Sequence, residues 1–234
     1  MKLAALFSGG KDSTYSIYKA RQMGHDVKCL ITLFPKSPNS HLLHFPNIKL
    51  TKLQSETMNI PHLVTDLETD ETNQEMNALW MLLKKAKQDF QIDGLVHGGI
   101  SSEFQKKRFE NICKENNLNI LTPLWKTNPK EYMNELIDSG FKFILTSVSS
   151  DGLDETWLGK IITISDLSKL SELSDKCGFN LNFEGGEAET FVVDCPLYLH
   201  PIQITKSKKI WDGYRGTLEI NDVGLDYSVK KNIV

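Results

Sequence analysis

The sequence has few cysteines, no long apolar run and no excess of positive charge. Its four cysteines are scattered and include no CxxC pair, which argues against a disulfide framework or a zinc site. No segment is apolar over transmembrane length, and the N-terminus lacks the apolar core and cleavage site of a signal peptide. We therefore expect a cytoplasmic protein that keeps its thiols reduced and does not enter a membrane. With 27 basic and 30 acidic residues, the net charge of −3 gives no general attraction to DNA or RNA.

The sequence also has neither a Walker loop nor a GxGxxG turn, and it carries a different glycine-rich segment near its start. Ser8-Gly9-Gly10-Lys11-Asp12-Ser13 follows the apolar run 3–7 and precedes a helical pattern that we expect over 14–23. Backbone N–H groups and the positive end of the helix dipole converge at such a turn. We expect both glycines to adopt positive φ and to let the backbone approach a phosphate closely.

The polar side chains of this turn suit an anion as well. Ser8 and Ser13 add hydroxyl donors, and Lys11 adds a cation that a purely structural turn does not need. Asp12 would repel a phosphate, so it predicts a Mg²⁺ ligand or a helix cap. The alternative is a plain strand–turn–helix connection, which leaves the convergence of these residue types unexplained.

Strand and helix patterns alternate through the first two thirds of the chain, which predicts an α/β fold with a parallel sheet and helices on both faces. The pattern changes near residue 126, so we predict a domain over 1–126 and a smaller α+β domain over 127–234. The predicted strands are 27–34, 62–64, 94–97, 120–121, 141–148, 191–193, 199–205 and 217–220. The predicted helices, besides 14–23, are 49–58, 76–90, 103–115 and two that carry residues 132–137 and 167–173.

Three polar loops follow predicted strands of the first domain: 8–13, 35–47 and 98–102. The carboxyl ends of parallel strands meet at one edge of a sheet, where open α/β folds bind their ligands. The sequence therefore predicts one shared site. Gly98 and Gly99 in the third loop predict a close approach to a ligand there.

A second unusual segment, Glu184-Gly185-Gly186-Glu187-Ala188-Glu189-Thr190, places three carboxylates around two glycines. These carboxylates could bind a metal, orient a cationic group or accept a proton. From the residue types alone, a solvated acidic turn before a strand is the simpler interpretation.

The SGGKDS turn resembles the PP-loop of the ATP pyrophosphatases, which cleave ATP between the α and β phosphates. Several further segments resemble one branch of that superfamily, the diphthine–ammonia ligases, in its short archaeal-type form. They occur in family order over almost the whole chain: 44–47, 98–105, 108–113, 123–125, 158–160 and 184–190. Glu103-Phe104 stands where an Asp-Tyr pair is commoner in the family, and Ala188 where a Phe is usual.

This resemblance implies ATP-dependent amidation of the diphthine carboxylate on elongation factor 2 by ammonia, with AMP and pyrophosphate as products and Mg as a cofactor. It implies catalytic roles for Lys11, Asp12, Glu187 and Glu189, with Asp12 as the Mg ligand. It also implies nucleotide contacts at Ser8, Gly9, Gly10, Lys11, Asp12, Ser13, Thr32, Leu33, His44, Gly98 and Gly99. Substrate contacts are implied at Asn47, Ser102, Glu103, Gln105, Glu184, Gly185, Gly186 and Thr190.

Several interpretations stay open at this point. Arg108 suits a phosphate contact or a structural ion pair, and we expect Trp125 in the core. The chain has no room for a separate glutaminase domain, so we expect free ammonia as the nitrogen source. A PP-loop enzyme that modifies transfer RNA and a non-catalytic ATP-binding protein are the alternative functions. We expect neither DNA nor a membrane as a partner. The sequence leaves open whether the protein forms a homodimer.

Overall fold

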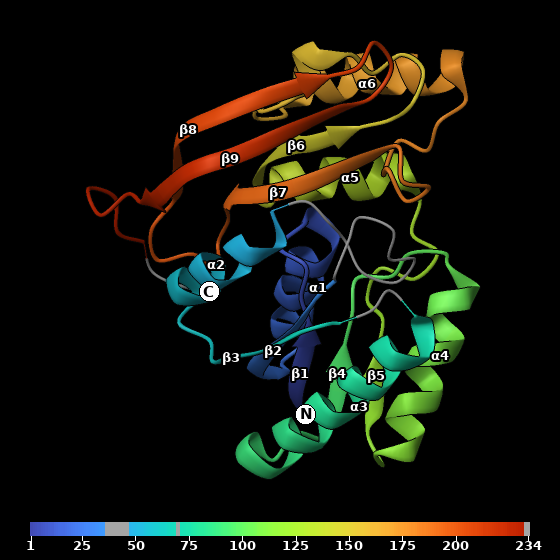
Figure 1. The fold of residues 1–234 in the computed structure, drawn as a ribbon, viewed down its shortest axis with the longest axis vertical. Coiled ribbons are helices and arrows are strands. Elements are labelled where there is room, and N and C mark those ends of the chain that lie inside the picture. Colours follow the sequence, from blue (N-terminus) through green and yellow to red (C-terminus); the bar gives the residue numbers. More distant parts are fainter. Residues whose placement is uncertain (36–46, 69–70, 232–234) are drawn as a thin grey trace. The chain divides into compact units, whose positions relative to one another are not determined.

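The computed structural model describes residues 1–35, 47–68 and 71–231, which belong to two compact units, Met1–Lys126 and Thr127–Val234. The positions of the two units relative to each other are not determined, so each is described by itself (Figure 1). The first unit has a parallel sheet with helices and the second an antiparallel sheet with helices. The fold class predicted from the sequence is thereby confirmed. Within the described ranges, no helix is long and apolar enough to cross a membrane.

The first unit is built on five parallel strands in the order β3-β2-β1-β4-β5 (Figure 1). The strands alternate along the chain with helices, which is the connection that parallel neighbours require. The elements are β1 (Lys2–Leu6), α1 (Lys11–Gln22), β2 (Asp26–Phe34), the 3₁₀ turn η1 (Ile48–Leu50), α2 (Thr51–Met58), β3 (His62–Asp66), α3 (Thr72–Phe90), β4 (Gly94–Val96), α4 (Glu103–Glu115) and β5 (Asn119–Leu121).

The sheet is buried on both faces, because its alternate residues serve different helices. Ala4, Ile31 and Leu95 join one core cluster with residues of α3 and α4, among them Leu83 and Phe109. The intervening residues of β1 and β2 point to the opposite face, and α1 contacts β1, β2 and β4. Helices on both faces therefore agree with the prediction.

Strand β1 lies at the centre of this sheet, with β2 on one side and β4 on the other. The chain order reverses its direction at β1, so the loops after β1 and β4 leave the sheet as neighbours at its carboxyl edge. Such a switch point is where open α/β sheets bind ligands. The glycine turn after β1 and the Gly98-Gly99 loop after β4 both lie there.

The second unit has four antiparallel strands in the order β7-β6-β9-β8 (Figure 1). Its elements are α5 (Pro129–Asp138), β6 (Lys142–Val148), the 3₁₀ turn η2 (Glu155–Trp157), α6 (Ile164–Cys177), β7 (Ala188–Asp194), β8 (Ile202–Trp211) and β9 (Gly216–Leu225).

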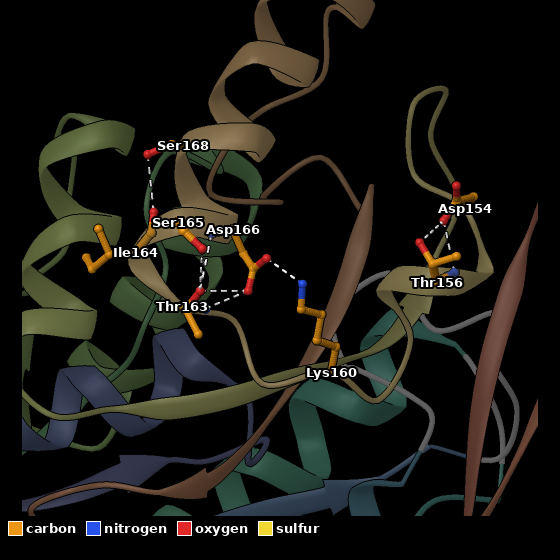
Figure 2. Close-up of polar contacts among 8 residues, drawn as sticks. All are labelled: Asp154, Thr156, Lys160, Thr163, Ile164, Ser165, Asp166 and Ser168. Atoms are coloured by element: carbon orange, nitrogen blue, oxygen red, sulfur yellow. Dashed lines mark hydrogen bonds and ion pairs between the residues drawn. The ribbon is translucent and has the colours of Figure 1, made fainter.

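Helix α6 begins with a capping box that also holds an ion pair (Figure 2). The Thr163 hydroxyl accepts a hydrogen bond from the Asp166 N–H (3.3 Å), and an Asp166 carboxylate oxygen accepts from the Thr163 N–H (3.1 Å). The Lys160 ammonium lies 2.5 Å from the other carboxylate oxygen. Burial acts to raise the pKa of Asp166, but the hydrogen bonds from Lys160 and Thr163 outweigh it and hold this pKa below its usual range.

Several predicted elements differ from the structure in their bounds, among them α1, α3, β7 and the last two strands. Helix α1 begins at Lys11 rather than at residue 14, because a polar first turn carries no apolar period. The last hairpin, predicted as 199–205 and 217–220, extends over Ile202–Trp211 and Gly216–Leu225. Exposed lysines at 206, 208 and 209 mask the two-residue period of β8, as is common in an edge strand.

Candidate functional site

The turn between β1 and α1 forms the centre of the site in the first unit. Gly9 has φ +79°, and Gly10 is the N-cap of α1 with φ −76° and ψ 170°. Positive φ is thus observed for Gly9, whereas the same expectation for Gly10 is wrong because an N-cap residue adopts the extended conformation. Since α1 begins at Lys11, the backbone N–H groups of 11–13 form its first turn, which carries the positive end of the helix dipole.

The hydroxyls of Ser8 and Ser13 form hydrogen bonds within this turn. The Ser13 hydroxyl oxygen accepts a hydrogen bond from the Ser8 N–H (3.2 Å), and the two hydroxyl oxygens lie 3.1 Å apart. Ser13 and Thr14 both donate to the Gly10 carbonyl, at 3.2 and 2.8 Å. The hydroxyls of Ser8 and Ser13 therefore meet at the mouth of the turn, where the sequence predicts a phosphate.

Lys11 and Asp12 form an ion pair at the same helix end. The Lys11 Nζ lies 2.9 Å from each carboxylate oxygen of Asp12, and Lys11 is only 1% exposed. Asp12 lies in the first turn of α1 and is not its N-cap, so the alternative role as a helix cap is wrong. The pair joins a buried cation to a partly exposed carboxylate at the turn where the sequence predicts a phosphate.

For the predicted magnesium ion, this turn offers one carboxylate. The described ranges contain no cluster of three His, Cys, Asp or Glu side chains that could hold a metal. Mg²⁺ commonly needs only one or two carboxylates, together with substrate phosphates and water. Asp12 can supply that carboxylate.

Gly98 lies directly against the first turn of α1. A Cβ atom on Gly98 would come within 2.5 Å of the Asp12 carbonyl carbon and 2.7 Å of the Ser13 backbone nitrogen. Only a residue without a side chain permits this approach of two backbones. The structure thus brings the loop after β4 onto the glycine turn, as expected for a shared site.

Gly99 is fixed by the buried His97. The Gly99 N–H donates to the His97 Nδ1 (3.0 Å), which places the ring hydrogen on Nε2. Burial, assisted by the charge of Lys106, lowers the pKa of His97 to about 4, so this ring is neutral at pH 7. His97 therefore orders the loop by accepting a hydrogen bond.

The end of β2 offers one backbone position to a ligand. Hydrogen bonds alternate along this strand: the Phe7 N–H donates to the Ile31 carbonyl on the β1 side, and the Leu67 N–H to the Phe34 carbonyl on the β3 side. By the same alternation, the backbone N–H and carbonyl of Thr32 face β3. Those of Leu33 face the β1 side, at a position beyond the last residue of β1. Of the two residues predicted to contact adenine, only Leu33 therefore directs its backbone groups to a position that a ligand could use. The backbone groups of Thr32 belong to the hydrogen-bond ladder with β3.

The Thr32 side chain is also engaged. Its hydroxyl donates to the Phe7 carbonyl (2.6 Å) and lies 2.8 Å from the His62 Nε2. Burial, followed by the charge of Lys52, lowers the pKa of His62 to about 4. No sequence pattern indicates the hydrogen bonds that connect Phe7, Thr32 and His62, because these residues are distant in sequence.

The predicted substrate residues of the first unit have different placements. Ser102 is the N-cap of α4 and accepts from the Gln105 N–H at 3.4 Å, and Glu103 lies in the first turn. Asn47 precedes η1 with φ +66°, and its carbonyl accepts from the Leu50 N–H. His44 lies outside the described residues.

One prediction near α4 is corrected, namely that Trp125 lies in the core, while a phosphate contact of Arg108 stays a prediction. Trp125 is half-buried rather than a core residue, and the Lys106 Nζ lies 4.2 Å from its ring centre. Arg108 stacks on Phe104, with its guanidinium carbon 3.4 Å from the ring centre, so it forms a cation–π pair.

Gln54 is a site residue that the sequence did not reveal. It lies in α2, is fully buried, and donates its amide N–H to the Gly9 carbonyl at 2.9 Å. A glutamine in a short helix has no distinctive spacing, and only tertiary packing brings α2 to the turn.

Hydrogen bonds hold the turn in the acidic segment 184–190 of the second unit. Gly186 has φ +83°, its carbonyl accepts from the Ser149 hydroxyl (2.7 Å), and the Glu187 carbonyl accepts from the Ser149 N–H (2.8 Å). The Glu187 Oε1 accepts from both the N–H and the side-chain amide of Asn180, at 2.9 and 2.8 Å. Residues 184–187 thus form a turn before β7, and within it Asn180 holds the Glu187 carboxylate.

The second oxygen of this carboxylate has a different environment. The Glu187 Oε2 is buried and has no hydrogen-bond partner within the parts of the chain that the structure describes. Glu187 directly precedes β7, and Glu189 lies in that strand, where it pairs with Ser147 of β6. Thr190 lies on the strand face opposite to Glu189, and Glu184 and Gly185 belong to the turn before β7. A Cβ atom on Gly185 would lie 2.6 Å from the Glu187 Oε1.

Comparison with known proteins agrees with both units. Residues 1–120 match the family model of the diphthamide synthase N-terminal domain, and residues 128–225 match that of the C-terminal domain. Curated relatives named diphthine–ammonia ligase include the mouse protein, 34% identical over 232 residues that cover 90% of this chain and 85% of the relative. The human protein is 33% identical over 233 residues, with the same coverage of both chains.

A solved structure from Methanocaldococcus jannaschii, described as a predicted subunit of tRNA methyltransferase, is also similar to this chain. It has a TM-score of 0.41 and 17% identity, and the match covers 83% of this chain and 97% of that one. The two family models together cover most of the present sequence, and they occur in the order of the two units. The chain therefore belongs to the diphthamide synthase family.

Proposed function

We propose that this protein uses ATP and ammonia to amidate the carboxylate of diphthine on elongation factor 2. The products would be diphthamide, AMP and pyrophosphate. Family membership supports this function, since the mouse and human relatives are named diphthine–ammonia ligases. The observation that carries it in the structure is the turn at the start of α1, where Gly9 and Gly98 allow backbone to surround an anion beside the buried Lys11.

Activation of the carboxylate explains why such a site is needed. A carboxylate resists ammonia because it is an anion and has no adequate leaving group. Attack of a carboxylate oxygen on the α phosphorus of ATP forms an acyl-adenylate and releases pyrophosphate. Ammonia then attacks the acyl carbon, the bond to AMP breaks, and one proton leaves the nitrogen.

The first unit would bind the nucleotide. Gly9, Gly10 and the hydroxyls of Ser8 and Ser13 would contact the β and γ phosphates, with Lys11 offsetting their charge. Asp12 would hold a Mg²⁺ ion, which supplies further neutralisation of the phosphates when bound. Positioning and charge neutralisation account for most of the catalysis in transfers of this kind.

Other residues of this unit would place the base and the acceptor. The N–H and carbonyl of Leu33 would contact adenine at the edge beyond β1. Gly98, Gly99 and His44 would complete the nucleotide contacts. The acceptor side would include Asn47, Ser102, Glu103 and Gln105.

The second unit would serve the amidation step. Glu187 combines an anchored oxygen with a buried one that requires a donor, and ammonium can supply such a donor. Glu187 and Glu189 would orient the incoming nitrogen and take its proton, with Glu184, Gly185, Gly186 and Thr190 around the acceptor.

The thiols bear on the alternative of tRNA thiolation, which commonly uses reactive cysteine pairs. All four cysteines are free, and three are buried. Burial raises the pKa of both Cys29 and Cys113 to about 12, so neither is a reactive thiolate at pH 7. These free thiols also support our proposal of a reducing, cytoplasmic location.

A single assay tests the function. Purified protein is incubated with diphthine-bearing elongation factor 2, Mg²⁺, ATP and ammonium chloride, and mass spectrometry follows the modified histidine. We expect the amide to form with equal amounts of AMP and pyrophosphate and without glutamine. Release of ADP and orthophosphate, or ATP binding without turnover, would overturn the proposal, and strict dependence on glutamine would overturn the use of free ammonia.

A further inference from the structure

We infer that Gln54 is a positioning residue of the triphosphate site, acting through the peptide that joins Gly9 to Gly10. This inference rests on the proposed use of ATP and adds a residue to which no role has been given. Gln54 is fully buried in α2, and its Nε2 donates to the Gly9 carbonyl at 2.9 Å in a buried contact.

The packing around Gly9 shows how closely α2 controls the turn. A Cβ atom on Gly9 would lie 2.2 Å from the Gln54 Oε1 and 3.2 Å from the Thr51 Cγ2. Two side chains of α2 therefore press against the one residue of the turn with positive φ. The side chains of α2 therefore support the conformation of the turn at Gly9.

The hydrogen bond also fixes the direction of a donor. A trans peptide is planar, so its carbonyl and the following N–H point in opposite directions. Because Gln54 holds the Gly9 carbonyl toward α2, the N–H of Gly10 is directed away from α2. Gly10 is the N-cap of α1, so its N–H adjoins those of the first helical turn, where the dipole favours a phosphate.

Loss of the Gln54 donor would have two separable consequences. The buried Gly9 carbonyl would lose its hydrogen bond, which destabilises the protein whether or not a ligand is present. The Gly9–Gly10 peptide could also rotate, which would turn a donor away from the β and γ phosphates. Only the second consequence depends on which part of the nucleotide is bound.

The test compares three probes with Gln54→Met, which keeps the side-chain volume and removes the donor. ATP, inorganic pyrophosphate and adenosine are titrated by calorimetry in the presence of Mg²⁺. We expect the Kd of ATP and of pyrophosphate to rise about fivefold to tenfold, as for one lost hydrogen bond to a buried group, and the Kd of adenosine to stay within twofold. In turnover, we expect the KM for ATP to rise while the KM for ammonium stays unchanged.

Ser55→Ala is the matched control, because Ser55 lies in the same helix and its hydroxyl donates to the Lys52 carbonyl at 2.8 Å. We expect it to lower Tm without changing any of the three Kd values. Gln54→Glu, which offers only acceptors to the Gly9 carbonyl, should weaken pyrophosphate binding more than Gln54→Met does.

Equal weakening of all three probes by Gln54→Met, or unchanged binding of ATP and pyrophosphate, would overturn the inference. Both results are measured without elongation factor 2. A wild-type protein that binds ATP but forms no amide would instead count against the proposed function alone.

Discussion

The two double-glycine turns of this protein differ in the element that follows them. Gly9-Gly10 leads into helix α1, and Gly185-Gly186 leads into strand β7. Each pair has one glycine with positive φ, the first in Gly9-Gly10 and the second in Gly185-Gly186. At the start of a helix, several unpaired N–H groups point to one place, whereas at the start of a strand the backbone groups form hydrogen bonds with a neighbouring strand. The first turn therefore suits an anion through its backbone, and the second can offer a ligand only its side chains.

The surroundings of the two glycines with positive φ differ just as clearly. Gly9 is enclosed by Gln54 and Thr51, while a Cβ on Gly186 would meet nothing within 4 Å. Identical substitutions in the two turns should therefore have very different effects.

The largest effect is expected for Gly9→Ala. Alanine at φ +79° is strained by about 1–2 kcal/mol, and its Cβ would collide with the Gln54 amide, so we expect a loss of about 2–4 kcal/mol in the free energy of unfolding. Calorimetry should detect no ATP binding. A variant that still binds ATP with wild-type affinity would show that this turn is not the phosphate site.

Glu187→Gln should separate the second turn from the first. The substituted side chain keeps an oxygen for the two Asn180 donors and removes the charge at Oε2, so amide formation should fall about a hundredfold while the Kd of ATP stays within twofold. Rapid-quench measurement of pyrophosphate and amide would test this. Asn180→Ala is the control for the anchoring contact, and weakened ATP binding in Glu187→Gln would contradict the division of roles.

The two units should respond to acid in different pH ranges. The folded-state pKa of His97 and of His62 is about 4, below the ordinary value of 6.5, so their contribution is complete above pH 6.5 and is lost as the pH falls toward 4. We expect the first unit to lose about 1 kcal/mol per pH unit from each histidine. The pKa of Asp166 in the second unit is also lowered, so its contribution is complete above about pH 4 and is lost only below that value.

Urea unfolding between pH 7 and pH 4.5, followed by hydrogen exchange of peptides from each unit, would measure this difference. His97→Phe lowers stability at pH 7 but should reduce the slope of stability against pH in the first unit. An unchanged slope in that variant would mean that His97 does not carry the acid sensitivity.

A smaller effect is expected for Lys160→Met. The Asp166 carboxylate is nearly buried, and it would keep its contacts with Thr163 but lose its only ion pair among the residues described (Figure 2). We expect the second unit to lose about 1–2 kcal/mol. Chemical denaturation is the measurement, and Lys169→Met on the exposed side of the same helix should cost nothing detectable.

Gly186→Ala should have the smallest effect. Its Cβ has open space, so only the strain of positive φ remains, and we expect a loss of about 1 kcal/mol in the free energy of unfolding. Thermal unfolding beside Gly9→Ala would measure the contrast. Equal destabilisation by the two substitutions would mean that the packing of Gln54 and Thr51 against Gly9 is not what separates them.

Local patterns in the sequence were enough for the α/β architecture, the α+β character of the second unit and the glycine turn. Apolar runs with period two or 3.6 report directly on buried faces, and SGGKDS carries its own chemistry. The pattern was less informative where local signals conflict with packing. The first turn of α1 is polar and β8 is rich in lysine, so their bounds were misplaced, and Trp125 was assigned to the core although lysine side chains cover its ring.

The sequence by itself determined which residue types are available for phosphate binding and for proton transfer, because composition and spacing are local properties. Only the tertiary structure decided which of these residues are fixed in position and which neighbouring residues fix them. Gln54 against Gly9 and Gly98 against the first turn of α1 join segments whose separation in the chain says nothing of their distance in space. Such contacts arise when helices and loops pack on a sheet, since burial of apolar faces fixes which backbones meet.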